Sequence, residues 1–179
     1  MSLPSTFRKL WTAQTVSAFG ARITREGLPI MAVTTLGASA ATLGVLAAVA
    51  SGAALAAALA TGGLIDRHRR RPLLIGADLL RAAVLIAIPI AAGLGVLTLP
   101  QVLTAAALVA AASVVFDIAS HSYLPSILGK AELVEGNSRL AATESVAEVG
   151  GPALAGLLFQ WLSAPIAVAA NAVTYLVSA

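Results

Sequence analysis

The chain has 179 residues, of which 59% are hydrophobic and 11% are charged, with a net charge of +3 and no cysteine. Soluble domains are roughly 45–50% apolar and about 25% charged, because their surfaces must carry polar groups, so this composition excludes a soluble enzyme domain. The apolar content also excludes a disordered chain, and the lack of cysteine excludes disulfide scaffolds, thiolate catalysis and cysteine metal sites.

Six apolar stretches follow one another along the chain, and each is predicted to form a transmembrane helix. They cover residues 10–36, 43–64, 73–92, 99–124, 134–162 and 165–179. About 20 helical residues span a hydrocarbon core of about 30 Å, and the first five stretches reach that length. The sixth has roughly 15 residues, so we expect a truncated sixth helix and a sequence that is a fragment of a longer protein.

A secretory signal peptide is the alternative interpretation of the first stretch, because Ala38, Ser39 and Ala40 resemble a cleavage site. The stretch before them is too long for a signal peptide, and it contains charged residues. More apolar stretches follow it, so we expect the first helix to be retained.

The basic residues alternate between the loops and predict an orientation in the membrane. They occur in the N-terminal tail, after the second stretch, and around the start of the fifth: Arg8, Lys9, Arg67, Arg69, Arg70, Arg71, Lys130 and Arg139. The other three loops carry no charge. Because cytoplasmic loops are enriched in lysine and arginine, we expect a multi-pass protein of the cell (plasma or inner) membrane with a cytoplasmic N-terminus.

The second stretch repeats small residues at every fourth position: Gly44, Ala48, Gly52, Ala56 and Ala60. Small residues at this spacing let another helix backbone approach closely. Two interpretations stay open, a tight bundle in an alanine-rich protein or a sliding helix contact in a protein that moves.

The sequence gives little support for a metal site, a nucleotide-binding loop or a set of catalytic residues. His68 and His121 have no ligand pattern around them, so no metal site is expected. No phosphate-binding loop and no set of nucleophile, base and orienting residue is present. We therefore expect no enzyme activity, no cofactor and no nucleic-acid partner, and any transport would be driven by an ion gradient.

A glycine and charge motif lies between the second and third stretches. Asp66 is a carboxylate among bases at a helix end, where it could accept backbone N–H groups of a neighbouring helix. The segment resembles the signature loop of the major facilitator superfamily, with matches at Gly62, Leu64, Asp66, Arg67, Arg70 and Arg71. Ile65 and Arg69 stand where that loop usually has alanine and glycine.

Further stretches resemble the exporter branch of that family, which includes siderophore and drug efflux permeases. They are residues 7–11 with 14–17, residues 77–82, and residues 133–137 followed by 151–156. The last stretch is similar to an abbreviated glycine–proline helix-bend motif of antiporters, with Gly151, Pro152 and Gly156.

The resemblance implies an all-α membrane protein, a single bundle over residues 1–179 that forms the N-terminal six-helix half of a twelve-helix fold. It implies a secondary active transporter, an antiporter that exports a small drug-like or siderophore-like compound by alternating access with coupled protons. It also implies a cytoplasmic gate that combines Gly62, Asp66, Arg67 and Arg70 with an acid of the fourth helix, for which Asp117 is the candidate. We expect Arg70 to pair with Asp117.

Charges inside the membrane form the second candidate site. The first stretch contains Arg22, Arg25 and Glu26, and the fifth contains Glu144 and Glu148. Each isolated charge at the midplane costs about 2.5–3.5 kcal/mol, so pairing is expected. If these helices are neighbours, as the resemblance implies, the rise per residue predicts the pairs Arg22–Glu144 and Arg25–Glu148 on the cavity side.

These membrane charges comprise two bases and three acids, so pairing leaves one carboxylate without a base partner. An acid without a base partner in apolar surroundings tends to take up a proton, which suits a proton-coupling site. Glu26 is the first candidate and Glu148 the second, and a purely structural ion-pair cluster is the alternative. Asp78 and Arg81, three residues apart, are expected to pair on one helix face in a structural role.

Two functions from different classes remain open. The favoured one is the carrier, whose partners are the lipid bilayer, a small-molecule substrate, protons, and a missing C-terminal half or a second half-carrier. The rival is a non-transporting membrane protein, either a degraded half-carrier or an assembly partner.

The predicted topology can be tested with single cysteines, because the chain has none of its own. We expect an impermeant thiol reagent applied to intact cells to label Ser39→Cys and Thr98→Cys and to leave Ser126→Cys unlabelled. Labelling at residue 126, or protection at both 39 and 98, would contradict the assignment.

Overall fold

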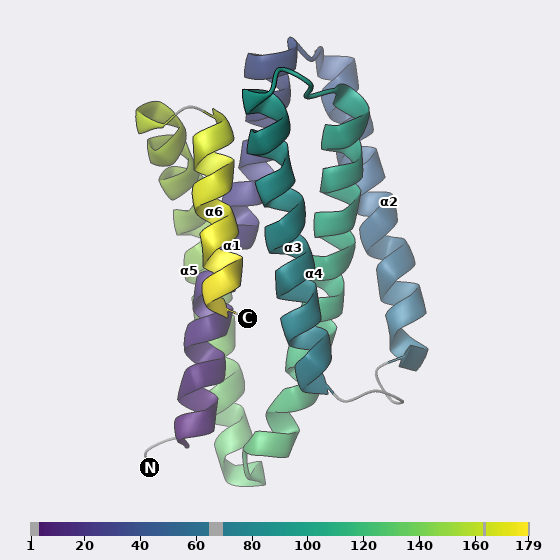
Figure 1. The fold of residues 1–179 in the computed structure, drawn as a ribbon. Helices are drawn as coiled ribbons and strands as arrows, with labels where there is room; N and C mark the ends of the chain where they lie inside the picture. The colour runs from purple at the N-terminus through teal and green to yellow at the C-terminus, as the bar shows by residue number, and fades with distance from the viewer. Residues whose placement is uncertain (1–3, 65–69, 163, 179) are drawn as a thin grey trace.

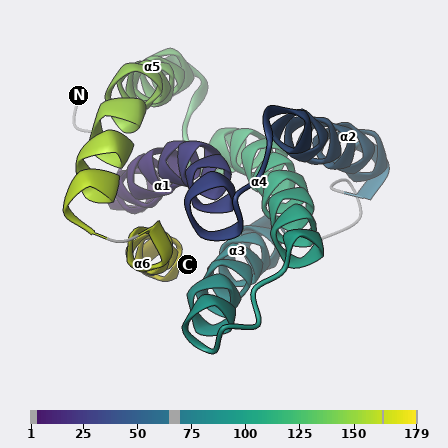
Figure 2. The same cartoon turned by 90° about the horizontal axis from the view of Figure 1, so that it is seen from above.

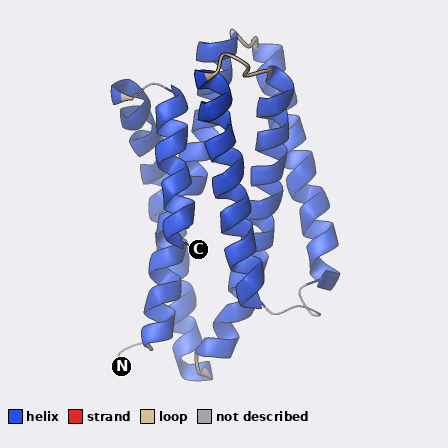
Figure 3. Cartoon of the chain, in the orientation of Figure 1, coloured by secondary structure: helices blue, strands red, loops and turns tan. Residues whose placement is uncertain are grey.

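Six helices make up the regular structure of residues 4–64, 70–162 and 164–178, the ranges that the computed structural model describes (Figures 1 and 3). They are α1 (Ser5–Leu36), α2 (Ala40–Leu64), α3 (Arg70–Gly93), α4 (Leu99–Ile127), α5 (Lys130–Trp161) and α6 (Ala164–Ser178). All six lie where the apolar stretches predicted them. Several begin earlier or end later than predicted, because polar residues continue a helix beyond its apolar part.

Within the described residues, three helices are long and apolar enough to cross a membrane: Ala40–Thr61, Arg70–Gly93 and Leu99–Ile127. The helices α1 and α5 are long but carry charged residues along their middles. The helix α6 is 15 residues long. The apolar character is therefore strongest in α2, α3 and α4.

The ends of the helices follow from local sequence. Gly37 closes α1 in the left-handed conformation, with φ of 64°, and its N–H donates to the carbonyl of Val33 at 3.0 Å. A glycine adopts this conformation without strain. At the start of α4, the N–H of Thr98 donates to Oε1 of Gln101 at 2.7 Å, which satisfies a donor that the helix itself leaves free.

The helices form a curved array in which each packs against its neighbours in the order α2, α4, α3, α6, α1, α5. Figure 2 shows this arrangement from above, with α2 and α5 at the two ends and α1 and α4 between them. Successive helices run in opposite directions along the bundle, so the loops after α1 and α3 lie at the same end. The N-terminus and the connection between α4 and α5 lie at the other end (Figure 1).

The packing of α1 against α5 and α6 depends on glycines. A Cβ atom at Gly151 of α5 would collide with the Cβ of Arg22, and one at Gly20 of α1 would collide with the side chain of Thr174. Phe159 lies against Gly27 in the same way. Because glycine has no side chain, the helix axes approach closely at these points.

The small-residue stripe of α2 takes no part in such packing. Gly44, Ala48, Gly52, Ala56 and Ala60 are all exposed, and a Cβ at Gly44 or Gly52 would meet nothing within 4 Å. The helix packs on α4 through other residues, such as the buried Leu46. The tight-bundle interpretation of the stripe is therefore wrong for the described part of the chain.

Gly151→Ala is expected to destabilise the bundle by about 1–3 kcal/mol, because the added methyl group overpacks the contact with Arg22. Gly156→Ala is the matched control on the same helix, since a Cβ at Gly156 meets nothing within 4 Å. Alanine there is expected to be neutral or to stabilise by up to about 1 kcal/mol. Thermal unfolding in detergent measures both, and equal effects would contradict the proposed close contact.

Candidate functional site

A cavity of about 860 Å³ opens between α1, α2, α4 and α5, on the concave side of the array. Small-molecule sites are typically clefts of about 300–1,000 Å³. Most of its lining residues belong to α1, α2, α4 and α5, and Figure 2 shows α1 and α4 between the end helices α2 and α5. The cavity is therefore large enough for one small organic molecule.

The two ends of the cavity differ in polarity. Near the loops after α1 and α3, its wall is made of the apolar side chains Leu28, Leu43, Leu46, Ala106 and Val109. Toward the other end of the bundle, α4 and α5 contribute polar and charged side chains: Asp117, His121, Thr143 and Glu144. The cavity is thus amphipathic along the bundle axis.

An ion pair joins α1 to α5 beside the cavity, and its arginine lines the cavity wall. Arg22 Nη2 contacts Glu148 Oε2, with 27% of the arginine side chain and 58% of the glutamate side chain exposed. The predicted partners Arg22–Glu144 and Arg25–Glu148 are wrong. Close approach at Gly151 places Arg22 beside that residue, one turn beyond Glu148, so Glu144 lies too far along α5.

Glu144 instead faces α4, where its Oε1 lies 3.9 Å from Nε2 of His121. Asp117 is one helical turn from His121 on α4, and all three residues line the cavity. The sequence interpretation set His121 aside for lack of a metal pattern. His121 follows Asp117 by four residues, which puts both on one helix face. This spacing was the signal in the sequence that could have identified His121 as a site residue.

Arg25 and Glu26 also line the cavity. Arg25 is exposed, Glu26 is partly buried, and neither has an ion-pair partner among the described residues. These two side chains are therefore available to a molecule in the cavity.

A second ion pair, in α3, is buried at the cavity wall, which Arg81 helps to line. Asp78 and Arg81 are each 1% exposed and contact each other directly, which confirms their predicted pairing. The guanidinium of Arg81 lies between two rings, 4.5 Å from the centroid of Phe116 and 4.4 Å from that of Tyr175. Its Nη1 also lies 3.4 Å from Oγ of Ser113 on α4. One buried charge thus ties α3 to α4 and α6.

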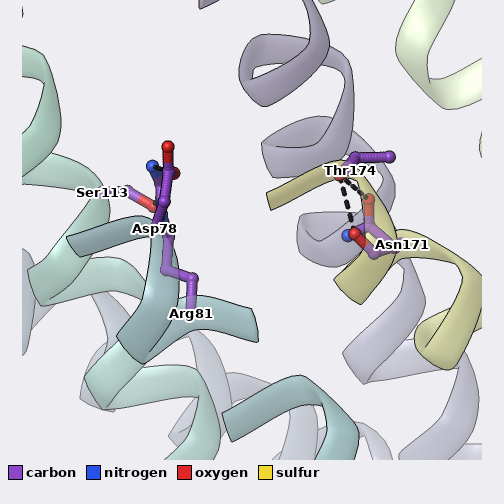
Figure 4. A network of polar contacts seen from close by, with 5 residues as sticks. All are labelled: Asp78, Arg81, Ser113, Asn171 and Thr174. Atoms are coloured by element: carbon purple, nitrogen blue, oxygen red, sulfur yellow. Dashed lines mark hydrogen bonds and ion pairs between the residues drawn. The ribbon is translucent and has the colours of Figure 1, made fainter. Parts of the chain in front are cut away.

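A buried amide links α6 to α1. Asn171 Nδ2 donates to the carbonyl of Gly20 at 2.8 Å and also to Oγ1 of Thr24. Thr174 donates back to the Asn171 carbonyl at 2.7 Å, and Figure 4 shows this group of α6 beside the Asp78, Arg81 and Ser113 group. The sequence interpretation missed Asn171, although a lone amide in an apolar helix often marks a hydrogen bond between helices.

The family model of the Major Facilitator Superfamily matches residues 10–179. The chain belongs to this superfamily. It is accordingly a membrane transporter of small molecules, in a family of carriers and not of enzymes. No individual curated protein matches the sequence.

The predicted cytoplasmic gate of the transporter lies partly outside the described residues, because Asp66 and Arg67 fall there. Gly62 is in the last turn of α2, and Arg70 is the first residue of α3. Arg70 does not pair with Asp117. The contact between Phe116 and Arg81 puts Asp117 near the level of Arg81, and Arg70 lies eleven residues before Arg81, about 16 Å along the helix.

The glycine–proline motif of the transporter lies within α5. Gly151 is buried against Arg22, whereas Pro152 and Gly156 are exposed. A proline inside a helix has no N–H, so the carbonyl of Glu148, four residues earlier, has no helical donor. The motif therefore combines a close contact with a weakened point in the helix backbone.

The buried pair predicts a large difference between two neutralising substitutions. Asp78→Asn leaves Arg81 without its carboxylate, which is expected to destabilise the transporter by about 3–5 kcal/mol. The control Glu135→Gln breaks an exposed pair with Arg139 and is expected to change stability by less than about 1 kcal/mol.

Thermal unfolding in detergent compares the two variants. Adding Arg81→Met to Asp78→Asn should recover part of the loss, because an unbranched apolar side chain can pack between the two rings. A double variant no more stable than Asp78→Asn alone would show that the charge is not the cause.

Proposed function

We propose that the chain forms one six-helix half of a proton-coupled secondary carrier that exports a small amphipathic compound, drug-like or siderophore-like, across the cell membrane. The observation that carries this proposal is the amphipathic cavity with charged residues of α1, α4 and α5 on its wall. Charged side chains within membrane-spanning helices are expensive and usually serve substrate or ion pathways.

Alternating access requires a second set of helices, which would cover the open side of the cavity. The two helices that flank the cavity present large apolar side chains with exposed fractions of 77% for Leu59, 82% for Val149 and 83% for Trp161. We propose that a second six-helix unit, in the same polypeptide or in another copy, packs between α2 and α5. Rocking of the two units would expose the cavity to either side.

Glu26 is the proposed proton-coupling residue. It is partly buried on the cavity wall and has no ion-pair partner among the described residues, whereas Glu148, the second candidate, is held by Arg22. A carboxylate without a base partner can take up and release a proton as access alternates. Binding of the proton and binding of the substrate would then compete within one cavity.

The gate is proposed at the end of the bundle that carries the N-terminus, with that end in the cytoplasm. Gly62 is in the last turn of α2, Arg70 is the first residue of α3, and Asp117 lies deeper, on the cavity wall. Asp66 and Arg67, between α2 and α3 in the sequence, are outside the described residues. Opening this end would admit cytoplasmic substrate to the charged part of the cavity.

Transport in inside-out vesicles with an imposed proton gradient tests the proposal. The probes are three largely apolar dyes of different charge: the cation rhodamine 6G, the neutral Nile red and the anion 8-anilinonaphthalene-1-sulfonate. Gradient-driven accumulation of at least one dye in vesicles with the transporter, and none in vesicles without it, is the expected result. If no dye moves, a carrier of amphipathic compounds is contradicted.

Glu26→Gln tests the coupling residue, because the amide keeps the shape of the side chain and cannot carry a proton. We expect gradient-driven accumulation to fall about tenfold or more, while energy-independent exchange of the same dye continues. Glu135→Gln, an exposed carboxylate of α5 outside the cavity, serves as the control. Normal accumulation by Glu26→Gln would eliminate this residue as the coupling site.

A further inference from the structure

We infer that the cavity selects amphipathic cations, molecules with an apolar body and a positive charge at one end. The inference rests on the proposed function, since it names the class of substrate that the carrier would take. Its first support is the charge left on the cavity wall after the internal ion pairs are formed.

Two of the three arginines that line the cavity are already neutralised. Glu148 contacts Arg22, and Asp78 contacts Arg81, which also lies between two aromatic rings. Arg25 is the remaining lining guanidinium, and the same wall carries three carboxylates outside these two pairs, those of Glu26, Asp117 and Glu144. Protonation of Glu26 would still leave two carboxylates against one guanidinium, so the wall keeps an excess of negative charge.

The second support is where these charges lie. Asp117 and His121 lie one helical turn apart on α4, and Glu144 of α5 reaches within 3.9 Å of His121 on the same cavity wall. The opposite end of the cavity is lined by leucine, valine and alanine side chains of α1, α2 and α4. A molecule with its cationic group at the acidic end can place its apolar body against that wall.

An anionic amphiphile would bind less well, because the excess charge on the cavity wall has the same sign as its own. Its negative group would have Arg25 to bind, but Glu26, Asp117 and Glu144 stand on the same cavity wall. Like charges within one cavity of low polarity repel each other. The cavity therefore discriminates by charge sign, with size and apolar character held equal.

Tetraphenylphosphonium and tetraphenylborate test this directly, because they have nearly the same shape and opposite charge. Equilibrium binding to the purified transporter in detergent, without any gradient, is expected to be about tenfold or more tighter for the cation. Its affinity should fall as salt is added, because ions screen the attraction. Equal or tighter binding of tetraphenylborate would overturn the inference.

Neutral variants identify the residues responsible. Asp117→Asn and Glu144→Gln are each expected to weaken tetraphenylphosphonium binding about fivefold, within the range of a partly exposed ion pair, and to leave tetraphenylborate binding unchanged or improved. The control Glu135→Gln should change neither. Equal effects of the control and the cavity variants would overturn the assignment, and the salt dependence of the unsubstituted protein still decides if a variant fails to fold.

Binding and transport separate this inference from the proposed function. Gradient-driven movement of 8-anilinonaphthalene-1-sulfonate, an amphipathic anion, in preference to rhodamine 6G would leave the carrier intact and overturn cation selectivity. A preference for tetraphenylphosphonium in binding, with no movement of any probe in energised vesicles, would support the selectivity of the cavity and contradict the carrier.

Discussion

A charge removed from water must be matched by a partner, and the arrangement of this bundle depends on that requirement. The pair Asp78–Arg81 is almost wholly buried, and the rings of Phe116 and Tyr175 cover the guanidinium on both faces. Replacing either ion alone would leave an uncompensated charge in surroundings of low polarity. The interaction thereby fixes α4 and α6 relative to α3, and α4 in turn carries one wall of the cavity.

The same requirement is met differently on the cavity side. Arg22 and Glu148 are paired but partly exposed, and further charges stand on the wall without ion-pair partners among the described residues. The buried charges of α3 thus hold helices in place, whereas those of α1, α4 and α5 remain available to solvent, protons or a bound molecule. Asn171 completes the framework by joining α6 to the backbone of α1.

Prolines occur at a regular spacing after charged or titratable residues in three of the helices that line the cavity. Each of three prolines inside α1, α4 and α5 follows a charged or titratable residue by four positions: Pro29 after Arg25, Pro125 after His121, and Pro152 after Glu148. A proline removes the helical donor to the carbonyl of that earlier residue, and helices bend most readily at such points. Arg25 and His121 on the cavity wall, and Glu148 that pairs with Arg22, therefore stand beside points where their helices bend most readily.

The sequence by itself determined the six helices, their class and the pair Asp78–Arg81, because hydropathy and a spacing of three residues act within one helix. The membrane charges of α1 and α5 were also recognised as a group. Their partners were not, because the register between these helices is fixed where Gly151 meets Arg22.

Packing between distant segments also decides two further features. It leaves the small-residue stripe of α2 exposed, and it brings Asn171 to Gly20, 151 residues away, where they form a hydrogen bond. Local patterns specify which helices form. Side-chain volumes at the points of contact decide how far each helix slides along its neighbour, and therefore which charges meet.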